Sequence, residues 1–266
     1  IYQVLQDNGI TPKKLYDPSA GSGVFTTEAI KAMPNLQHIT AVEKDLLTGM
    51  VLTALNSTNS IKTDTHVMGL EKTSNDENGM FDLVASNIPF GNFSIYDPAF
   101  RNTGVTGKIH NYFFAKGLDK LADGGIMAYI TTDGFLNSPS NMEARRYLFD
   151  RADFVALAVM PDNLMKDSGN TEAPNHLLIV QKNTGKKELS ADEQLLAATD
   201  KKQNDFGSFF QNSYIQQHPE IIIGEVSAGT NQYGQPHEKV WVSGDINQAA
   251  IQLKEILAKA IKANVK

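Results

Sequence analysis

The stretch Ala85-Ser86-Asn87-Ile88-Pro89-Phe90-Gly91 carries the strongest signal for the fold of this chain. It follows an apolar run, residues 79–84, whose β-branched and aromatic residues predict a buried strand. The carboxyl ends of central strands in open α/β sheets face the crevice where ligands bind. We therefore expect Asn87 to face a ligand, although a turn capped by Asn and followed by a buried Phe is an open alternative.

Four consecutive residues of this turn suit a planar ligand with an exocyclic amino group. The side-chain oxygen of Asn87 and the backbone carbonyl of Ile88 are two neighbouring hydrogen-bond acceptors. Pro89 fixes its φ and has no N–H of its own, and Phe90 supplies a flat apolar face. Asn87, Ile88, Pro89 and Phe90 are therefore the candidate catalytic residues.

A second motif lies about seventy residues upstream. Residues 13–17 predict a short strand, which leads into the turn Pro18-Ser19-Ala20-Gly21-Ser22-Gly23 and a helix start at Val24. Strand, Gly-rich turn and helix together are typical of the nucleotide-binding start of a doubly wound sheet. The turn lacks the Gly-Lys-Ser/Thr of a P-loop and the third Gly of the dinucleotide fingerprint. Asp17 just before it suits an amine better than a phosphate.

An acidic residue ends the next predicted strand, residues 38–43. Glu43 follows Gly23 by twenty residues, a spacing at which an acid can hydrogen-bond ribose hydroxyls. Residues 44–55 then predict a helix with Leu47, Val51, Leu52 and Leu55 on one buried stripe.

Composition narrows the class of protein. The chain has 266 residues, 41% of them hydrophobic, which is enough for one large α/β domain and an appendage. No membrane span or signal peptide is predicted, and the absence of Cys weakly favours the cytoplasm. The net charge of −6 argues against a strong grip on nucleic acid by this chain alone. Since residue 1 is Ile, we expect a longer parent protein.

Three parts of the sequence follow one another in a fixed order: Asp17 to Phe25, Glu43, and Asn87 to Phe90. Together they resemble the class I S-adenosylmethionine-dependent methyltransferases. Within this class they are similar to the N6-adenine DNA methylases with an Asn-Pro-Pro-Tyr/Phe signature. The stretch from Asn87 to Phe93, with Asp97 after it, resembles the methylase portion of large helicase–methylase proteins of phages and conjugative elements. The resemblance covers roughly residues 1–185. Ile88 stands where the signature has Pro at its second position, but it keeps the carbonyl acceptor.

The resemblance implies a fold, a cofactor and a set of contacts. We expect a doubly wound, mostly parallel seven-stranded sheet in residues 1–185, with the last strand antiparallel, and a small α+β extension in residues 186–266. S-adenosyl-L-methionine is the expected cofactor, no metal is needed, and flipped adenine in DNA and further domains of a parent protein are the expected partners. The residues expected to bind the cofactor are Asp17, Ser19, Ala20, Gly21, Gly23, Phe25, Glu43, Lys44, Gly69, Leu70 and Asn87.

The remaining segments complete the expectation. Residues 93–108 predict a long loop, either a flap over the target base or a mobile surface loop. Residues 109–122 and 141–151 predict helices, and 126–131, 153–160 and 175–181 predict strands. In the extension, residues 183–208 predict a linker with one short helix. A hairpin is predicted from 221–226 and 239–242, followed by an amphipathic helix over 246–263.

Two other functions remain open from the sequence. The same acceptors suit an RNA base or the amide of a protein glutamine, because each presents a planar NH₂ group. A domain that binds cofactor poorly and serves as a scaffold in a DNA-processing protein is the other alternative.

Overall fold

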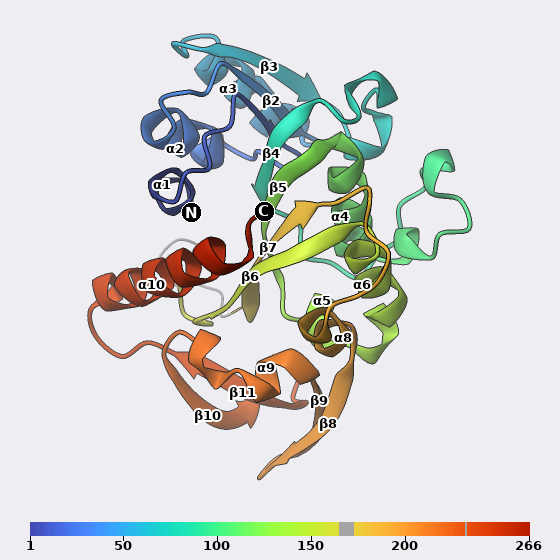
Figure 1. Ribbon diagram of the computed structural model, residues 1–266, viewed down its shortest axis with the longest axis vertical. Coiled ribbons are helices and arrows are strands. Elements are labelled where there is room, and N and C mark those ends of the chain that lie inside the picture. Colours follow the sequence, from blue (N-terminus) through green and yellow to red (C-terminus); the bar gives the residue numbers. More distant parts are fainter. Residues whose placement is uncertain (165–172, 232) are drawn as a thin grey trace.

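A seven-stranded sheet forms the centre of the protein, whose computed structural model describes residues 1–164, 173–231 and 233–266 (Figure 1). The strand order is β3-β2-β1-β4-β5-β7-β6, and only β7 runs antiparallel to its neighbours. The strands are β1 (Lys14–Asp17), β2 (His38–Glu43), β3 (Lys62–Val67), β4 (Phe81–Asn87), β5 (Leu121–Thr132), β6 (Ala152–Met160) and β7 (Asn175–Lys182). The expected doubly wound architecture is confirmed.

Helices cover both faces of this sheet, and each face has its own apolar cluster. Four helices pack on one face: α1 (Tyr2–Asp7), α2 (Val24–Ala32), α3 (Leu46–Asn56) and α10 (Ile246–Asn264). The other face is covered by α4 (Ile109–Lys120), α6 (Met142–Phe149), α8 (Ala191–Ala197) and α9 (Ser213–Gln217), with the short α5 (Gly134–Asn137) beside them. Strand residues alternate between the two clusters, as a pleated sheet requires.

Short 3₁₀ turns connect several of these elements. They are η1 (Leu70–Lys72), η2 (Asn75–Glu77), η3 (Pro98–Phe100), η4 (Val105–Gly107), η5 (Pro139–Asn141) and η6 (Pro219–Ile221). Most of the segment predicted to separate β6 from β7 lies outside the described residues.

The predicted buried stripe of α3 is wrong in all but one residue. Leu52 is fully buried, whereas Leu47, Val51 and Leu55 are 74%, 54% and 52% exposed. The helix packs on β2 and β3 through Gly49, where an added Cβ would lie only 2.5 Å from a methyl of Val67. The inward face of α3 thus carries Gly49, Leu52 and Asn56, and the other three residues of the predicted stripe stay exposed.

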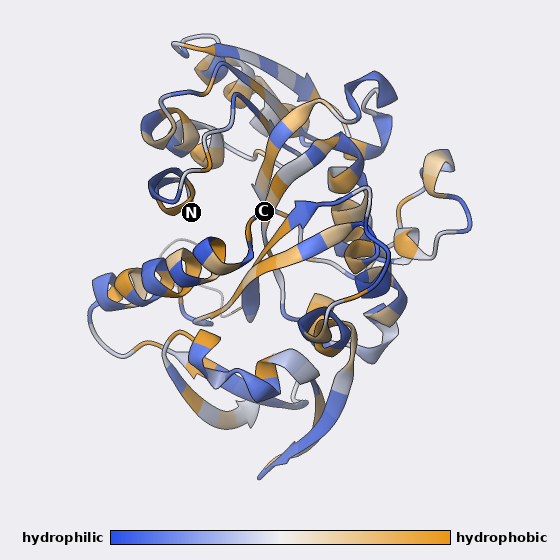
Figure 2. Ribbon diagram, in the orientation of Figure 1, coloured by the Kyte–Doolittle hydropathy of each residue, from blue (hydrophilic) through white to orange (hydrophobic). Residues whose placement is uncertain are grey.

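The segment predicted as a linker, residues 183–208, contains more structure than its composition indicates. It holds α8 and strand β8 (Thr199–Asn204), which pairs with β9 (Gly207–Asn212) in an antiparallel hairpin. Figure 2 shows β8 as largely hydrophilic, so no alternating pattern predicted it. Its order comes instead from backbone pairing.

A second hairpin lies beside the first, formed by β10 (Glu225–Thr230) and β11 (Pro236–Trp241). The predicted hairpin is therefore present, but its first strand begins at Glu225 rather than at residue 221. Helix α10 packs on β6 with Ala249, Leu257 and Ile261 buried. Ile246, the first residue of this helix, is 55% exposed.

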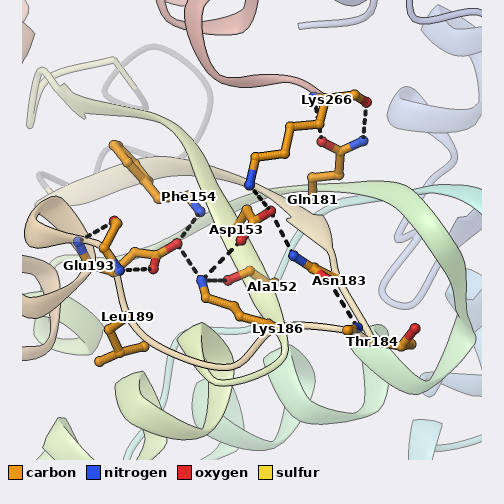
Figure 3. Close-up of polar contacts among 12 residues, drawn as sticks. Ala152, Asp153, Phe154, Gln181, Asn183, Thr184, Lys186, Leu189, Glu193 and Lys266 are labelled. Atoms are coloured by element: carbon orange, nitrogen blue, oxygen red, sulfur yellow. Dashed lines mark hydrogen bonds and ion pairs between the residues drawn. The ribbon is translucent and has the colours of Figure 1, made fainter.

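Buried ion pairs tie the C-terminal segment to the sheet (Figure 3). Lys186 lies 3.2 Å from Asp153 and pairs with Glu193, whose carboxylate also accepts the backbone N–H of Phe154 at 2.8 Å. Lys266 donates its backbone N–H to Gln181 and its ammonium to Asp153. Residues after β7 thus share their polar contacts with the sheet itself.

Within the described residues, no helix combines the length and the apolar character needed to cross a lipid bilayer.

Candidate active site

Three of the predicted site residues end three neighbouring strands. Asp17 closes β1, Glu43 closes β2 and Asn87 closes β4, and these strands are adjacent in the order β2-β1-β4. The chain reverses its winding direction between β1 and β4, which is the point where open α/β sheets bind ligands. The structure therefore brings together residues that lie up to seventy positions apart in the sequence.

Asp17 is fully buried beneath the Gly-rich turn. Its Oδ1 accepts hydrogen bonds from the Ser86 hydroxyl at 2.7 Å and the Ser19 backbone N–H at 3.2 Å. Its Oδ2 is buried and accepts no hydrogen bond from any described residue. Burial raises the pKa of Asp17 to about 7, although the bonds from Ser86 and Ser19 oppose this. A cationic amine nearby would restore the charged form and supply the absent partner.

Glu43 is held in place by the backbone of two turns. Its Oε2 accepts the N–H of Gly21 at 2.9 Å, and its Oε1 accepts the N–H of Asp45 at 2.8 Å. Gly21 has a φ of +54° and Gly23 a φ of +88°, a region that favours glycine. At Gly23 an added Cβ would also lie 2.9 Å from Leu52. The two glycines therefore let the turn wrap closely around the Glu43 carboxylate.

A cavity of about 510 Å³ opens at these strand ends. Its volume lies within the range of small-molecule sites. Of the predicted site residues, five line it: Ser19, Glu43, Lys44, Leu70 and Pro89. The further lining residues are Pro18, Asp45, Leu46, Met68, Glu71, Phe93, Ile95, Ile109 and Phe113. The cavity thus combines carboxylates with apolar walls, which fits a nucleoside that carries a charged amine.

The other predicted cofactor contacts are not among the described residues that line this cavity: Asp17, Ala20, Gly21, Gly23, Phe25, Gly69 and Asn87. Ala20 is buried and donates its N–H to Val42, so it shapes the turn. Gly69 precedes Leu70 in the chain. Phe25 packs edge-on against Tyr2, with 6.0 Å between ring centroids, and is not among the described residues that line the cavity. Direct contact of these residues with a cofactor stays a prediction.

Asn87 and Ile88 form the end of β4. The N–H of Ile88 donates to the carbonyl of Ile130 at 3.0 Å, which fixes the backbone of the turn. The Oδ1 of Asn87 is buried and receives no hydrogen bond from any described residue. An unpaired buried acceptor costs about 1–3 kcal/mol. An incoming N–H would remove that cost.

A second cavity, of about 380 Å³, lies next to the first. The turn after Asn87 separates them, because Pro89 lines the first cavity while Phe90, 41% exposed, lines the second. The further lining residues are Gly91, Asn92, Lys108, His110, Thr132, Asp133, Gly134, Ser138, Asn141, Ala173, Pro174, Asn231, Tyr233 and His237. Asn87 ends the strand that leads into this turn, and it is not among the described residues that line either cavity.

The loop 93–108 forms a wall shared by both cavities. Phe93 and Ile95 face the first cavity, and Lys108 at the loop end faces the second. Asp97 anchors this loop from inside: it is 5% exposed and accepts hydrogen bonds from Tyr112 at 2.7 Å and Lys116 at 3.1 Å. The expected surface loop is thus pinned at its centre, and a role as a flap stays a prediction.

Burial would raise the pKa of Asp97, but its hydrogen bonds and the Lys116 charge outweigh burial and lower it. The carboxylate is therefore charged at neutral pH and pairs with a buried ammonium.

Sequence reasoning missed most of the second cavity. Asn231, Tyr233 and His237 come from the β10–β11 hairpin, some 140 residues after Phe90. The sequence predicted this hairpin, but nothing in its pattern indicated a place beside Phe90. In the first cavity, Met68 and Glu71 flank the predicted Gly69 and Leu70 and could have been included by position alone.

Residues 1–226 match the family described as N-6 DNA methylase. The chain belongs to the N-6 DNA methylase family. The resemblance drawn from Asp17, Glu43 and Asn87 is thereby confirmed. No curated protein matches the chain in sequence.

Solved structures agree on the fold. The EcoKI M protein of a type I restriction enzyme superposes with a TM-score of 0.59 at 14% identity, covering 98% of this chain and 70% of its own. A modification subunit of a type I restriction enzyme from Vibrio vulnificus gives 0.56 at 13% identity, covering 94% and 59%. A class I S-adenosylmethionine-dependent methyltransferase from Listeria monocytogenes gives 0.53 at 18%, covering 71% and 58%.

These likenesses establish a Rossmann-like methyltransferase fold with additional small antiparallel sheets near the C-terminus. The chain spans less than two thirds of the length of the second and third of these structures. Family membership supports S-adenosylmethionine as the cofactor.

Proposed function

We propose that this chain transfers a methyl group from S-adenosylmethionine to the N6 amine of adenine in DNA. The observation that carries this proposal is the buried Oδ1 of Asn87, unpaired among the described residues, at the end of β4 just before Pro89 and Phe90, which line the first and the second cavity. Membership of the N-6 DNA methylase family supports it.

The first cavity fits the cofactor through its chemistry. Asp17 and Glu43 would hold the amine and the ribose hydroxyls, and the apolar side chains of Met68 and Leu70 would cover the adenine ring. When bound, S-adenosylmethionine supplies an electrophilic sulfonium methyl group. The unpaired Oδ2 of Asp17 is the feature of this chain that a cationic amine completes.

Asn87 and Ile88 would activate the acceptor. The N6 lone pair of adenine is delocalised into the ring, which makes the amine a poor nucleophile. If the Asn87 Oδ1 and the Ile88 carbonyl accept the two N6 hydrogens, the nitrogen shifts toward sp³ geometry and exposes its lone pair. These acceptors act most strongly as positive charge develops on nitrogen. As the N6–methyl bond forms, the bond between the methyl group and the cofactor sulfur would break, and one N6 proton would pass to water.

The second cavity would receive the adenine after it leaves the duplex. Enzymes that modify a base take it out of the helix stack, and Phe90 offers a ring on which the base can stack. The net charge of −6 makes a strong independent grip on duplex DNA unexpected. We therefore propose that further domains or subunits hold the DNA and select its sequence.

Labelled S-adenosylmethionine incubated with DNA, RNA and protein substrates tests the function. We expect N6-methyladenine in the DNA, detected by mass spectrometry of the nucleosides. Label found only in RNA or in glutamine side chains would assign another acceptor. Calorimetry showing no affinity for the cofactor would support a scaffold instead.

A further inference from the structure

One wall of the second cavity comes from the turn between β10 and β11. The family match ends at residue 226, before this turn begins. Asn231 holds this turn: its backbone N–H donates to Gln235 at 2.8 Å, and its Oδ1 accepts the N–H groups of Tyr233 at 2.9 Å and Gln235 at 3.0 Å. The turn is therefore built to present Tyr233 in one place.

Tyr233 is the most exposed large hydrophobic side chain among the described residues, at 79%. It nevertheless lines the same cavity as Phe90, which is itself 41% exposed. Two partly exposed aromatic rings, from segments about 140 residues apart, thus line one cavity. Each offers apolar surface on which a flat aromatic ligand can stack.

The polar side of the cavity fits a nucleobase. His110 is only 5% exposed, and its Nε2 lies 3.3 Å from the Asn141 amide nitrogen, which donates to it. The ring proton of a neutral His110 is then on Nδ1, which is buried and has no partner among the described residues. Burial lowers the pKa of His110 to about 4, so the ring is neutral at pH 7. His110 thus contributes to the lining of the cavity a neutral ring whose Nδ1 has no partner among the described residues.

We propose that Tyr233 binds the acceptor nucleobase by stacking, so that the β10–β11 hairpin is part of the acceptor site together with Phe90. This inference rests on the proposed function, because it takes the second cavity to be the place of the acceptor. It assigns to the C-terminal hairpin a role in holding the base.

An oligonucleotide-binding experiment on the full chain tests the proposal. The probe is single-stranded oligodeoxyadenylate with one 2-aminopurine, in the presence of S-adenosylhomocysteine, and the readouts are anisotropy and 2-aminopurine fluorescence. We expect Tyr233→Ala to weaken binding by about 5- to 100-fold, in line with the loss of one stacked base, and to reduce the quenching. Tyr233→Phe keeps the ring and should bind like the wild type.

Phe206→Ala is the matched control. Phe206 is 57% exposed between β8 and β9 and does not line the cavity in the described structure. Calorimetry with S-adenosylhomocysteine shows whether each variant is folded. Equal binding by Tyr233→Ala and wild type, an equal loss in Phe206→Ala, or the absence of quenching in the wild type would each overturn the inference. Base binding that depends on Tyr233 without any methyl transfer by the wild type would instead reject the proposed function alone.

Discussion

The two cavities on either side of the turn after Asn87 are built in different ways. The first takes its walls from residues 18–113, chiefly from the ends of four parallel strands. The second takes its walls from residues 90–237, including a hairpin far from the sheet in sequence. The first cavity is thus a local product of the doubly wound fold, whereas the second is assembled from segments far apart in the chain. Under the proposed function, substrate choice would change by altering the second without disturbing the first.

The largest expected effect comes from breaking the wall that the cavities share. Asp97→Ala leaves the buried Lys116 ammonium without its carboxylate, and removing one partner of a buried ion pair typically costs about 3–5 kcal/mol. We expect a clear drop in the free energy of unfolding and weaker binding of both cofactor and oligonucleotide. Urea unfolding and calorimetry measure these effects.

The Asp97 contribution has a defined pH dependence. Its folded pKa lies below the unfolded value of 3.8, so the stabilisation is present above pH 3.8 and is lost as the pH falls through the folded pKa. The difference between wild type and Asp97→Ala should therefore shrink in acid. Asp205→Ala, at an exposed position, is the control and should unfold like the wild type. Normal binding of cofactor and oligonucleotide by Asp97→Ala would show that the loop needs no anchor.

Asn87→Ala should separate transfer from binding. Removing one preorganised group that stabilises developing charge costs about 10²–10³-fold in rate. Cofactor affinity should stay close to that of the wild type, because Asn87 is not among the described residues that line the first cavity. The rate is measured by transfer of a labelled methyl group, and the cofactor affinity by calorimetry. Parallel losses of rate and cofactor affinity would count against the proposed role.

The same variant makes a prediction about stability. The Oδ1 of Asn87 is buried and unpaired among the described residues, so its removal also removes a desolvation cost. We expect Asn87→Ala to be as stable as the wild type or more stable. Asn78→Ala, at an exposed position, is the control substitution.

The sequence predicted that three candidate residues would meet at one edge of the sheet, because the signals for them are local. Asp17, Glu43 and Asn87 each follow a strand that the apolar pattern marks, and parallel strands place their carboxyl ends together. The apolar periodicity did not predict the packing of α3, where the close approach at Gly49 leaves most of the predicted leucine stripe exposed. It also failed for β8, a hydrophilic strand, and for Tyr233, whose place beside Phe90 depends on long-range docking.

Among the expected effects on ligand binding and methyl transfer, the loss of cofactor affinity in Asp17→Asn is the smallest and the most specific. Asp17→Asn keeps an oxygen for the Ser86 and Ser19 donors but cannot carry the charge that an amine requires. Hydrogen bonds to charged groups are worth about 1.5–3 kcal/mol. We therefore expect cofactor affinity at pH 8 to fall by roughly 10- to 100-fold, with oligonucleotide binding unchanged.

Asp17→Asn should weaken cofactor binding but stabilise the folded protein at pH 8. In the unfolded chain Asp17 loses its proton near pH 3.8, whereas in the folded protein it keeps the proton up to about pH 7. Between these values the folded state binds more protons, so stability falls as the pH rises, by about 4 kcal/mol in total. Asp17→Asn escapes this loss and should melt at a higher temperature than the wild type at pH 8, but not at pH 4. Equal melting temperatures at pH 8 would mean that the carboxylate carries no burial cost, and unchanged cofactor affinity would remove Asp17 from the site.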